Sequence, residues 1–226
     1  MFSKSEENYL KSIFSLKQKT NNAISTNDIA KNINISPSSV SDMLKKLEKK
    51  DLITYTKYKG VDLTSKGYLH AKIILRKHRL WETFLVKKLD FSWHEVHEIA
   101  EQLEHIKSDK LINKIDEFLD FPKYDPHGEP IPSKEGLIPS NNYSVLADSE
   151  IGCKATIMGV NNDDSLFLIY LDEVGINIGN KIEIIKKINF DNSIEIKINQ
   201  KKLHITEQVA KHLLIKKHKN GKIRGI

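Results

Sequence analysis

Residues 25–53, STNDIAKNINISPSSVSDMLKKLEKKDLI, decide the fold at the N-terminal end of this 226-residue chain. Ser25, followed three residues later by Asp28, is a capping pair that predicts the start of a helix. Ser36 as N-cap and Pro37 at the first helical position predict the start of a second helix. Two short helices across a tight turn are typical of a helix-turn-helix.

The flanking sequence extends this motif in both directions. Tyr9, Leu10, Ile13 and Phe14 recur at helical spacing and predict a preceding helix with one buried face. After the motif, residues 51–64 (DLITYTKYKGVDLT) predict two strands joined near Gly60, the wing of a winged helix-turn-helix. We therefore expect a DNA-binding domain over residues 1–64.

The second helix of the motif has a polar face that suits DNA. Val40, Met43, Leu44 and Leu47 form its apolar stripe, and small polar residues and lysines lie opposite. Small residues can approach base edges closely, and lysines suit phosphates. The candidate DNA-binding residues are Ser36, Pro37, Ser38, Ser39, Ser41, Asp42, Lys45, Lys46 and Lys49 on the helix and Lys57 and Lys59 on the wing. The alternative is an ordinary three-helix domain with a lysine-rich solvated face.

The next block, residues 65–140, reads as helical. Ser65 begins a long helix, Ser92 is expected to cap the next, and Ile112, Ile115 and Leu119 mark a third. The apolar surface is large for so few residues. We therefore expect part of it to form the interface of a homodimer, which would present two recognition helices about one DNA turn apart.

Two stretches of this block carry metal-ligating side chains. In residues 94–105, HEVHEIAEQLEH, a helical turn of about 100° per residue places four of them on one narrow face, and two more share a face of the preceding helix. These residues are His97, Glu101, Glu104 and His105, and His78 and Glu82. Three imidazoles and three carboxylates on neighbouring helices predict a divalent-cation site, although such residues on one helix are often only its solvated face.

The C-terminal part has a different pattern. Residues 122–150 contain most of the prolines and predict a stiff connector. Over residues 150–226, the segments CKATIMGV, SLFLIYL, KIEIIKKI and SIEIKI predict short strands. A short helix over 207–212 and a last strand would complete a small β-barrel.

Composition narrows the function classes. The net charge of +6 is a mild bias towards polyanions such as nucleic acid. One cysteine excludes a disulfide framework and a thiolate zinc cage within one chain. The sequence contains no apolar segment long enough for a membrane span and no signal peptide at its N-terminus, so we expect a cytoplasmic protein without a membrane partner.

Several of these stretches together resemble the diphtheria toxin repressor family of metal-dependent transcriptional regulators, including the manganese transport regulators. They are EENYLKSIF (6–14), ISPSSVSDMLKKLEKKDLI (35–53), LTSKGYLHAKIILRKHRLWE (63–82), VHEIAEQLEH (96–105) and DPHGEPIP (125–132). The resemblance implies an α+β multidomain fold. Its parts are a winged helix-turn-helix (1–64), an all-α dimerisation domain that carries metal (65–140) and an SH3-like β-barrel (150–226).

The resemblance also implies two metal sites per subunit. The first would use His78, Glu82 and His97, and the second would use Glu101, Glu104, His105 and Asn8. In iron-responsive members a cysteine stands where this chain has Glu101, so the carboxylate points to hard oxygen ligation and to Mn(II), with Fe(II) as the alternative. Manganese-responsive members place a further carboxylate where this chain has Lys11, which cannot ligate while protonated.

The function these features imply is metal-dependent repression of metal-uptake genes through a double-stranded, palindromic operator, with no catalytic residues. A metal-independent winged-helix regulator is one alternative. A metal-dependent hydrolase is another, but HEVHE is not the H-E-x-x-H pattern of zinc proteases and no nucleophile elbow is present. DNA binding measured with and without a chelator separates the three.

Overall fold

The computed structural model describes residues 2–20, 22–56 and 60–218. The chain divides into two compact units. The first comprises Met1–Trp81, Ala100–Phe121 and Ile131–Ile138, and the second comprises Glu82–Ile99, Pro122–Pro130 and Pro139–Ile226. The long helix α4 (Ser65–Leu89) contributes residues to both units.

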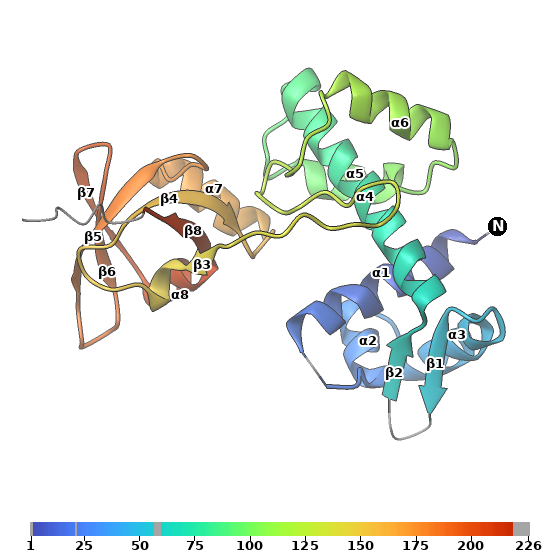
Figure 1. The fold of residues 1–226 in the computed structure, drawn as a ribbon. Coiled ribbons are helices and arrows are strands. Elements are labelled where there is room, and N and C mark those ends of the chain that lie inside the picture. The colour runs from blue at the N-terminus through green and yellow to red at the C-terminus, as the bar shows by residue number, and fades with distance from the viewer. Residues whose placement is uncertain (1, 21, 57–59, 219–226) are drawn as a thin grey trace, which may run out of the picture. The chain divides into compact units, whose positions relative to one another are not determined.

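The N-terminal elements of the first unit form the predicted winged helix-turn-helix (Figure 1). They are α1 (Lys4–Lys19), α2 (Thr26–Asn32), α3 (Pro37–Lys49), β1 (Ile53–Thr56) and β2 (Gly60–Leu63). The predicted caps are confirmed. The Ser25 hydroxyl accepts from the Asp28 backbone N–H at 3.1 Å, and Ser36 caps α3 with Pro37 in the first turn. Antiparallel β1 and β2 form the wing.

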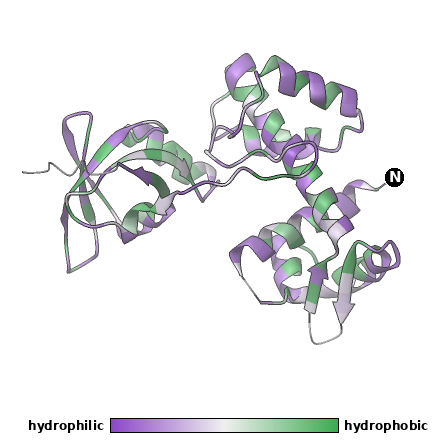
Figure 2. Cartoon of the chain, viewed as in Figure 1, coloured by the Kyte–Doolittle hydropathy of each residue, from purple (hydrophilic) through white to green (hydrophobic). Residues whose placement is uncertain are grey.

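One hydrophobic core unites these elements. The α1 residues Leu10, Ile13 and Phe14 pack with Leu44 and Leu47 of α3 and with residues of the wing. Figure 2 shows the corresponding apolar faces of the helices. The opposite face of α3 is exposed and carries the polar residues of the predicted recognition surface.

The helical block continues with α5 (Val96–Leu103) and α6 (Asp109–Phe118). The expectation that Ser92 caps α5 is wrong, because the helix begins only at Val96. The Ser92 backbone N–H instead donates to the Glu95 carboxylate at 2.9 Å in a turn that precedes the helix. The helix α6 has its own cap, Ser108, whose side chain accepts from the Leu111 backbone N–H at 3.2 Å.

The C-terminal part of the second unit is one antiparallel sheet with strand order β3-β8-β4-β5-β6-β7. Its elements are β3 (Ser144–Val145), the 3₁₀ turn η1 (Leu146–Asp148), β4 (Lys154–Val160), α7 (Ser165–Val174), β5 (Lys181–Lys187), β6 (Ile194–Ile198), β7 (Lys201–Ile205), α8 (Glu207–His212) and β8 (Leu213–Lys217). Alternate residues of the strands meet in an isoleucine-rich core. The predicted short helix over 207–212 and the last strand are confirmed.

The segment SLFLIYL, predicted as a strand, is helix α7. The Asp164 side chain accepts from the Phe167 backbone N–H at 3.1 Å and caps the helix start. Gly175 ends the helix in the left-handed region at φ 75°. Leu168 and Leu171, three residues apart, face the core. A short apolar run fits both a buried strand and a buried helix, and here the caps at its two ends decide.

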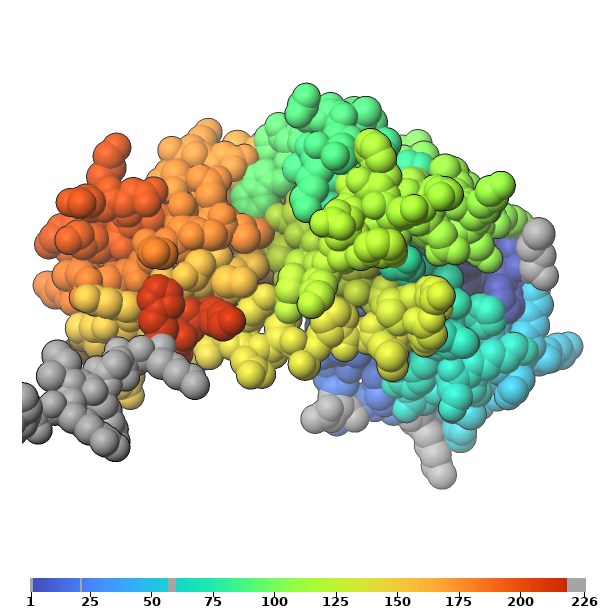
Figure 3. All heavy atoms as spheres, turned by 45° about the horizontal axis from the view of Figure 1, so that its top comes forward, coloured from blue at the N-terminus to red at the C-terminus, as the bar shows by residue number. Residues whose placement is uncertain are grey.

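The connector residues 131–138 lie on the first unit, against the N-terminal half of α4 (Figure 3). The contact is close at Gly136, where an added Cβ would lie 2.9 Å from Leu69 Cδ1. Among the residues that the structure describes, no helix has the length and apolar character needed to span a membrane.

Candidate metal centres and DNA-binding surface

The predicted recognition surface lies on α3. Ser36, Pro37, Ser38, Ser39, Asp42, Lys45, Lys46 and Lys49 are exposed, and Ser41 is half-buried. Lys57 and Lys59 lie outside the described residues. Ser41 donates to the Pro37 carbonyl at 3.1 Å, and Asp42 pairs with Lys45 at 3.3 Å. Lys46 and Lys49 are exposed residues of the last turn of the helix. Their role in binding DNA stays a prediction.

A first group of polar and charged side chains belongs to the first unit, and we call it the α1–α5 cluster. It consists of Glu7, Asn8 and Lys11 of α1, His78 of α4, and Glu101, Glu104 and His105 in and directly after α5. Glu104 is fully buried. Its Oε2 atom lies 2.7 Å from His78 Nδ1 and 2.8 Å from Lys11 Nζ. The Lys11 ammonium also contacts the Glu101 carboxylate.

Three buried ligand atoms of the α1–α5 cluster have no hydrogen-bond partner within the described residues. They are Asn8 Oδ1, Glu104 Oε1 and His105 Nε2, and the last two lie 3.7 Å apart. The other ring nitrogen of His105 lies 2.5 Å from Glu7 Oε2, which orients the imidazole. Buried polar atoms are seldom left unsatisfied, and these donors are oxygens and an imidazole nitrogen, as a divalent cation prefers. The residues of this cluster therefore fit a metal ion.

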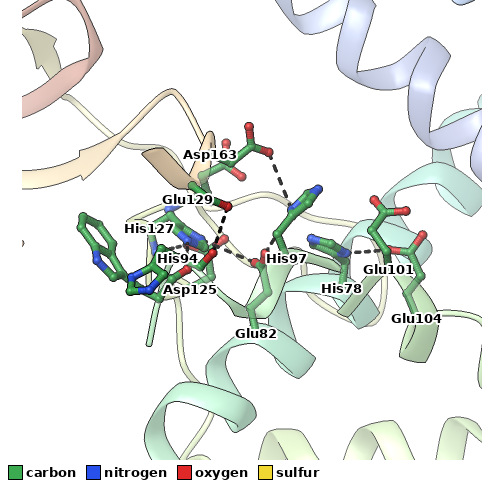
Figure 4. Close-up of polar contacts among 12 residues, drawn as sticks. His78, Glu82, His94, His97, Glu101, Glu104, Asp125, His127, Glu129 and Asp163 are labelled. Atoms are coloured by element: carbon green, nitrogen blue, oxygen red, sulfur yellow. Dashed lines mark hydrogen bonds and ion pairs between the residues drawn. The ribbon is translucent and has the colours of Figure 1, made fainter. Parts of the chain in front are cut away.

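A second group belongs to the second unit, and we call it the Glu82 cluster. Ligand atoms of Glu82, Asp125 and His127, all buried, lie within 4.8 Å of one another. Glu82 Oε1 lies 3.5 Å from His97 Nδ1, and that nitrogen lies 3.7 Å from Asp163 Oδ2 in the loop after β4. Figure 4 shows these side chains pointing toward one another. Three carboxylates and two imidazoles fit a hard divalent cation.

The backbone around His127 holds this cluster in place. Asp125 accepts from the backbone N–H groups of His127 and Glu129 at 2.8 and 2.9 Å, which defines a tight turn. Gly128 adopts φ 83°, and an added Cβ there would lie 2.1 Å from the Met158 carbonyl oxygen of β4. Only glycine allows this approach, so the turn is fixed against the sheet.

The pKa of His127 shows how strongly Glu82 acts on it. Burial alone would lower this pKa, but the Glu82 carboxylate, with Asp125, raises it to about 9. The Nε2 atom lies 2.8 Å from the Trp93 carbonyl, which can only accept, so this nitrogen carries a proton. The other nitrogen, Nδ1, lies 3.8 Å from Glu82 Oε2 and would be the ligand atom. A metal must therefore displace a proton from Nδ1.

Contacts among the described residues link several of the predicted ligands, and both ligand sets implied by the resemblance stay predictions. His78 contacts Glu104, and Glu82 contacts His97. Asp125 and His127, which lie beside Glu82 as candidate ligands, were not singled out from the sequence. Their signal was the sequence DPHG within the connector, a turn with two ligand-type side chains two residues apart.

Three family models match successive segments of the chain. Residues 1–61 match the family described as "Iron dependent repressor, N-terminal DNA binding domain". Residues 64–133 match "Iron dependent repressor, metal binding and dimerisation domain", and residues 145–217 match the FeoA domain. The transcriptional regulator MntR of Listeria welshimeri is 36% identical over 121 residues, which are 52% of this chain and 84% of that protein. The chain belongs to the diphtheria toxin repressor family.

Two further matches are a solved structure and a membrane transport protein. A solved structure described as a manganese-dependent transcriptional repressor in complex with manganese superposes with a TM-score of 0.86 and 31% identity, covering 94% of this chain and all of that one. A probable metal transport system membrane protein of Chlamydia trachomatis is 42% identical over 86 residues, which are 38% of this chain. This family member spans only 19% of that relative's length.

Proposed function

We propose that this protein is a metal-dependent transcriptional repressor that binds operator DNA when Mn(II) is plentiful and so controls metal-uptake genes. The observation that carries the proposal is the position of α1. Its apolar residues Leu10, Ile13 and Phe14 belong to the core of the helix-turn-helix, while its polar residues Glu7 and Lys11 reach the α1–α5 cluster. A change at the cluster is therefore transmitted directly to the DNA-binding domain.

The donor set supports Mn(II) over softer ions, with Fe(II) as the alternative. When bound, the metal would supply the positive charge that draws oxygen and imidazole donors of separate helices together. Asn8 on α1 and Glu104 and His105 after α5 would hold it, and Glu82, Asp125 and His127 would hold a second ion. Because one set of donors includes α1, metal binding would favour one position of the recognition helix over others.

The proposed assembly is a homodimer on a palindromic operator. Leu111, Phe118 and Phe121, in and directly after α6, are exposed apolar residues, the last two by 62% and 63% of their surface. A second copy covering them would form a two-fold dimer with two α3 helices facing successive major grooves. We further propose domains over 1–64, 65–140 and 150–226, a cytoplasmic location and no catalytic activity.

The test measures DNA binding by fluorescence anisotropy, with a duplex selected from a random pool in the presence of Mn(II). We expect a chelator to weaken binding about 5- to 150-fold, the range of typical allosteric coupling. His105→Ala should remove most of this dependence, whereas the matched control His204→Ala, an exposed histidine of the sheet, should preserve it.

The outcomes separate the alternatives. Binding that is equally tight with a chelator favours the metal-independent regulator. No DNA binding under any condition favours another class, such as the hydrolase. Replacing Glu101 with Cys should shift the preference towards softer ions, and an unchanged preference would remove the argument from ligand hardness.

A further inference from the structure

The position of Lys11 gives the α1–α5 cluster a cation of its own. The Lys11 ammonium donates to Oε2 of the fully buried Glu104 at 2.8 Å and also contacts the Glu101 carboxylate. Its side chain is only 16% exposed. A buried carboxylate is stable only when its charge is compensated. Lys11 contributes a positive charge here, and His78 Nδ1 lies 2.7 Å from the same Glu104 oxygen.

The ammonium also connects two parts of the first unit that a metal would otherwise join. Lys11 lies on α1 between Leu10 and the buried residues Ile13 and Phe14, whereas Glu104 directly follows α5. A lysine at this position is covalently attached and always present. It therefore links α1 to the end of α5 whether or not metal is available.

Lys11 does not contact all the potential metal-ligand atoms of the cluster. Glu104 Oε1 and His105 Nε2, 3.7 Å apart, and Asn8 Oδ1 are buried without hydrogen-bond partners within the described residues. These atoms are the candidate ligands of one metal ion. The two carboxylate oxygens that a second, neighbouring ion would need are the ones that Lys11 contacts.

We propose that the Lys11 ammonium takes the place of a second metal ion in the α1–α5 cluster, so that this cluster binds a single Mn(II) and α1 is held partly docked without metal. This inference rests on the proposed function, since it assumes that Mn(II) binds here at all. It implies that metal tightens an existing link between α1 and the end of α5 and does not create one.

The test counts bound Mn(II) per chain by equilibrium dialysis of the full-length protein. Lys11→Glu replaces the ammonium with a carboxylate, and we expect this variant to bind one Mn(II) more than the unaltered chain. The matched control is Lys17→Glu. Lys17 also lies on α1 and pairs with a carboxylate, Asp62 at 2.8 Å, but it does not contact the cluster, so its replacement should leave the count unchanged.

An equal count in the Lys11→Glu variant and the unaltered chain would overturn the proposal. Absence of Mn(II) binding in the unaltered chain would instead overturn the proposed function, so the two failures are distinct. Electron paramagnetic resonance of the unaltered chain decides the question even if Lys11→Glu does not fold. Signals of isolated ions support the proposal, and an exchange-coupled pair that disappears in Glu101→Gln refutes it.

Discussion

The raised pKa of His127 predicts a strong pH dependence of metal binding at the Glu82 cluster. Glu82 raises this pKa to about 9, so at neutral pH the imidazole is protonated in the metal-free protein. The metal must displace this proton, and the apparent affinity should therefore rise about tenfold for each pH unit below 9. Between pH 6.5 and 8.5 we expect an increase of about a hundredfold.

The interval between pH 7.5 and 8.5 is the decisive one. An imidazole with the ordinary pKa of about 6.5 has already lost its proton there and would give a nearly constant affinity.

The proton on His127 also affects folding stability, which should fall as the pH rises, whereas the affinity for the metal should increase. Because the pKa of His127 is higher in the folded chain, its contribution to stability is complete below about pH 6.5 and is lost as the pH rises through about 9.

Isothermal titration calorimetry with Mn(II) measures both the affinity for the metal and the number of protons released on binding. We would use the His105→Ala variant, which removes a proposed ligand of the α1–α5 cluster, in buffers of different ionisation enthalpy at pH 6.5, 7.5 and 8.5. We expect release of about one proton per metal bound at the two lower pH values. A flat affinity above pH 7.5 without proton release would refute the reasoning, and His204→Gln, added as a control, should leave the slope unchanged.

Three further predictions concern DNA binding and stability. Lys49→Ala should weaken binding to all sequences alike and lower the salt slope by about 1, and an effect limited to one operator base would contradict a phosphate contact. Arg76 lies 2.7 Å from Asp116 in a nearly buried ion pair, and Arg76→Met removes this partner. The substitution should lower the free energy of unfolding by about 4 kcal/mol in urea titrations. Adding Asp116→Leu to the same chain should recover part of that loss. Gly67→Ala should cost about 3 kcal/mol, because the new Cβ would lie 1.9 Å from the Leu52 carbonyl oxygen, and an unchanged midpoint would show that the backbone moves aside.

Short-range signals predicted the N-terminal domain well. The capping pair of Ser25 and Asp28 and the cap at Ser36 depend on side chains that bond to backbone only three residues away. Such interactions are visible in the sequence because they need no other part of the fold. The helical spacing of Val40, Leu44 and Leu47 likewise predicted which face of α3 is buried.

Where two local structures were equally compatible with the apolar pattern, the prediction was wrong. Residues 165–171 fit a strand by composition but form α7, since Asp164 and Gly175 cap a helix at either end and Leu168 and Leu171 then face the core. These caps were present in the sequence. Their significance became clear only with the position of the segment beside the sheet.

The sequence by itself determined that this chain contains a winged helix-turn-helix and two helical segments rich in metal-ligating side chains. Only the tertiary structure decided how those side chains combine: that His127 of the connector meets Glu82, that His78 contacts Glu104, and that Lys11 contacts Glu101 and Glu104 across at least ninety residues of sequence. The physical reason is the separation in sequence of the residues that interact. Caps and helical faces depend on neighbours within a turn or two of the helix. A cation site forms where distant segments of the chain converge, and the local sequence pattern does not show which segments those are.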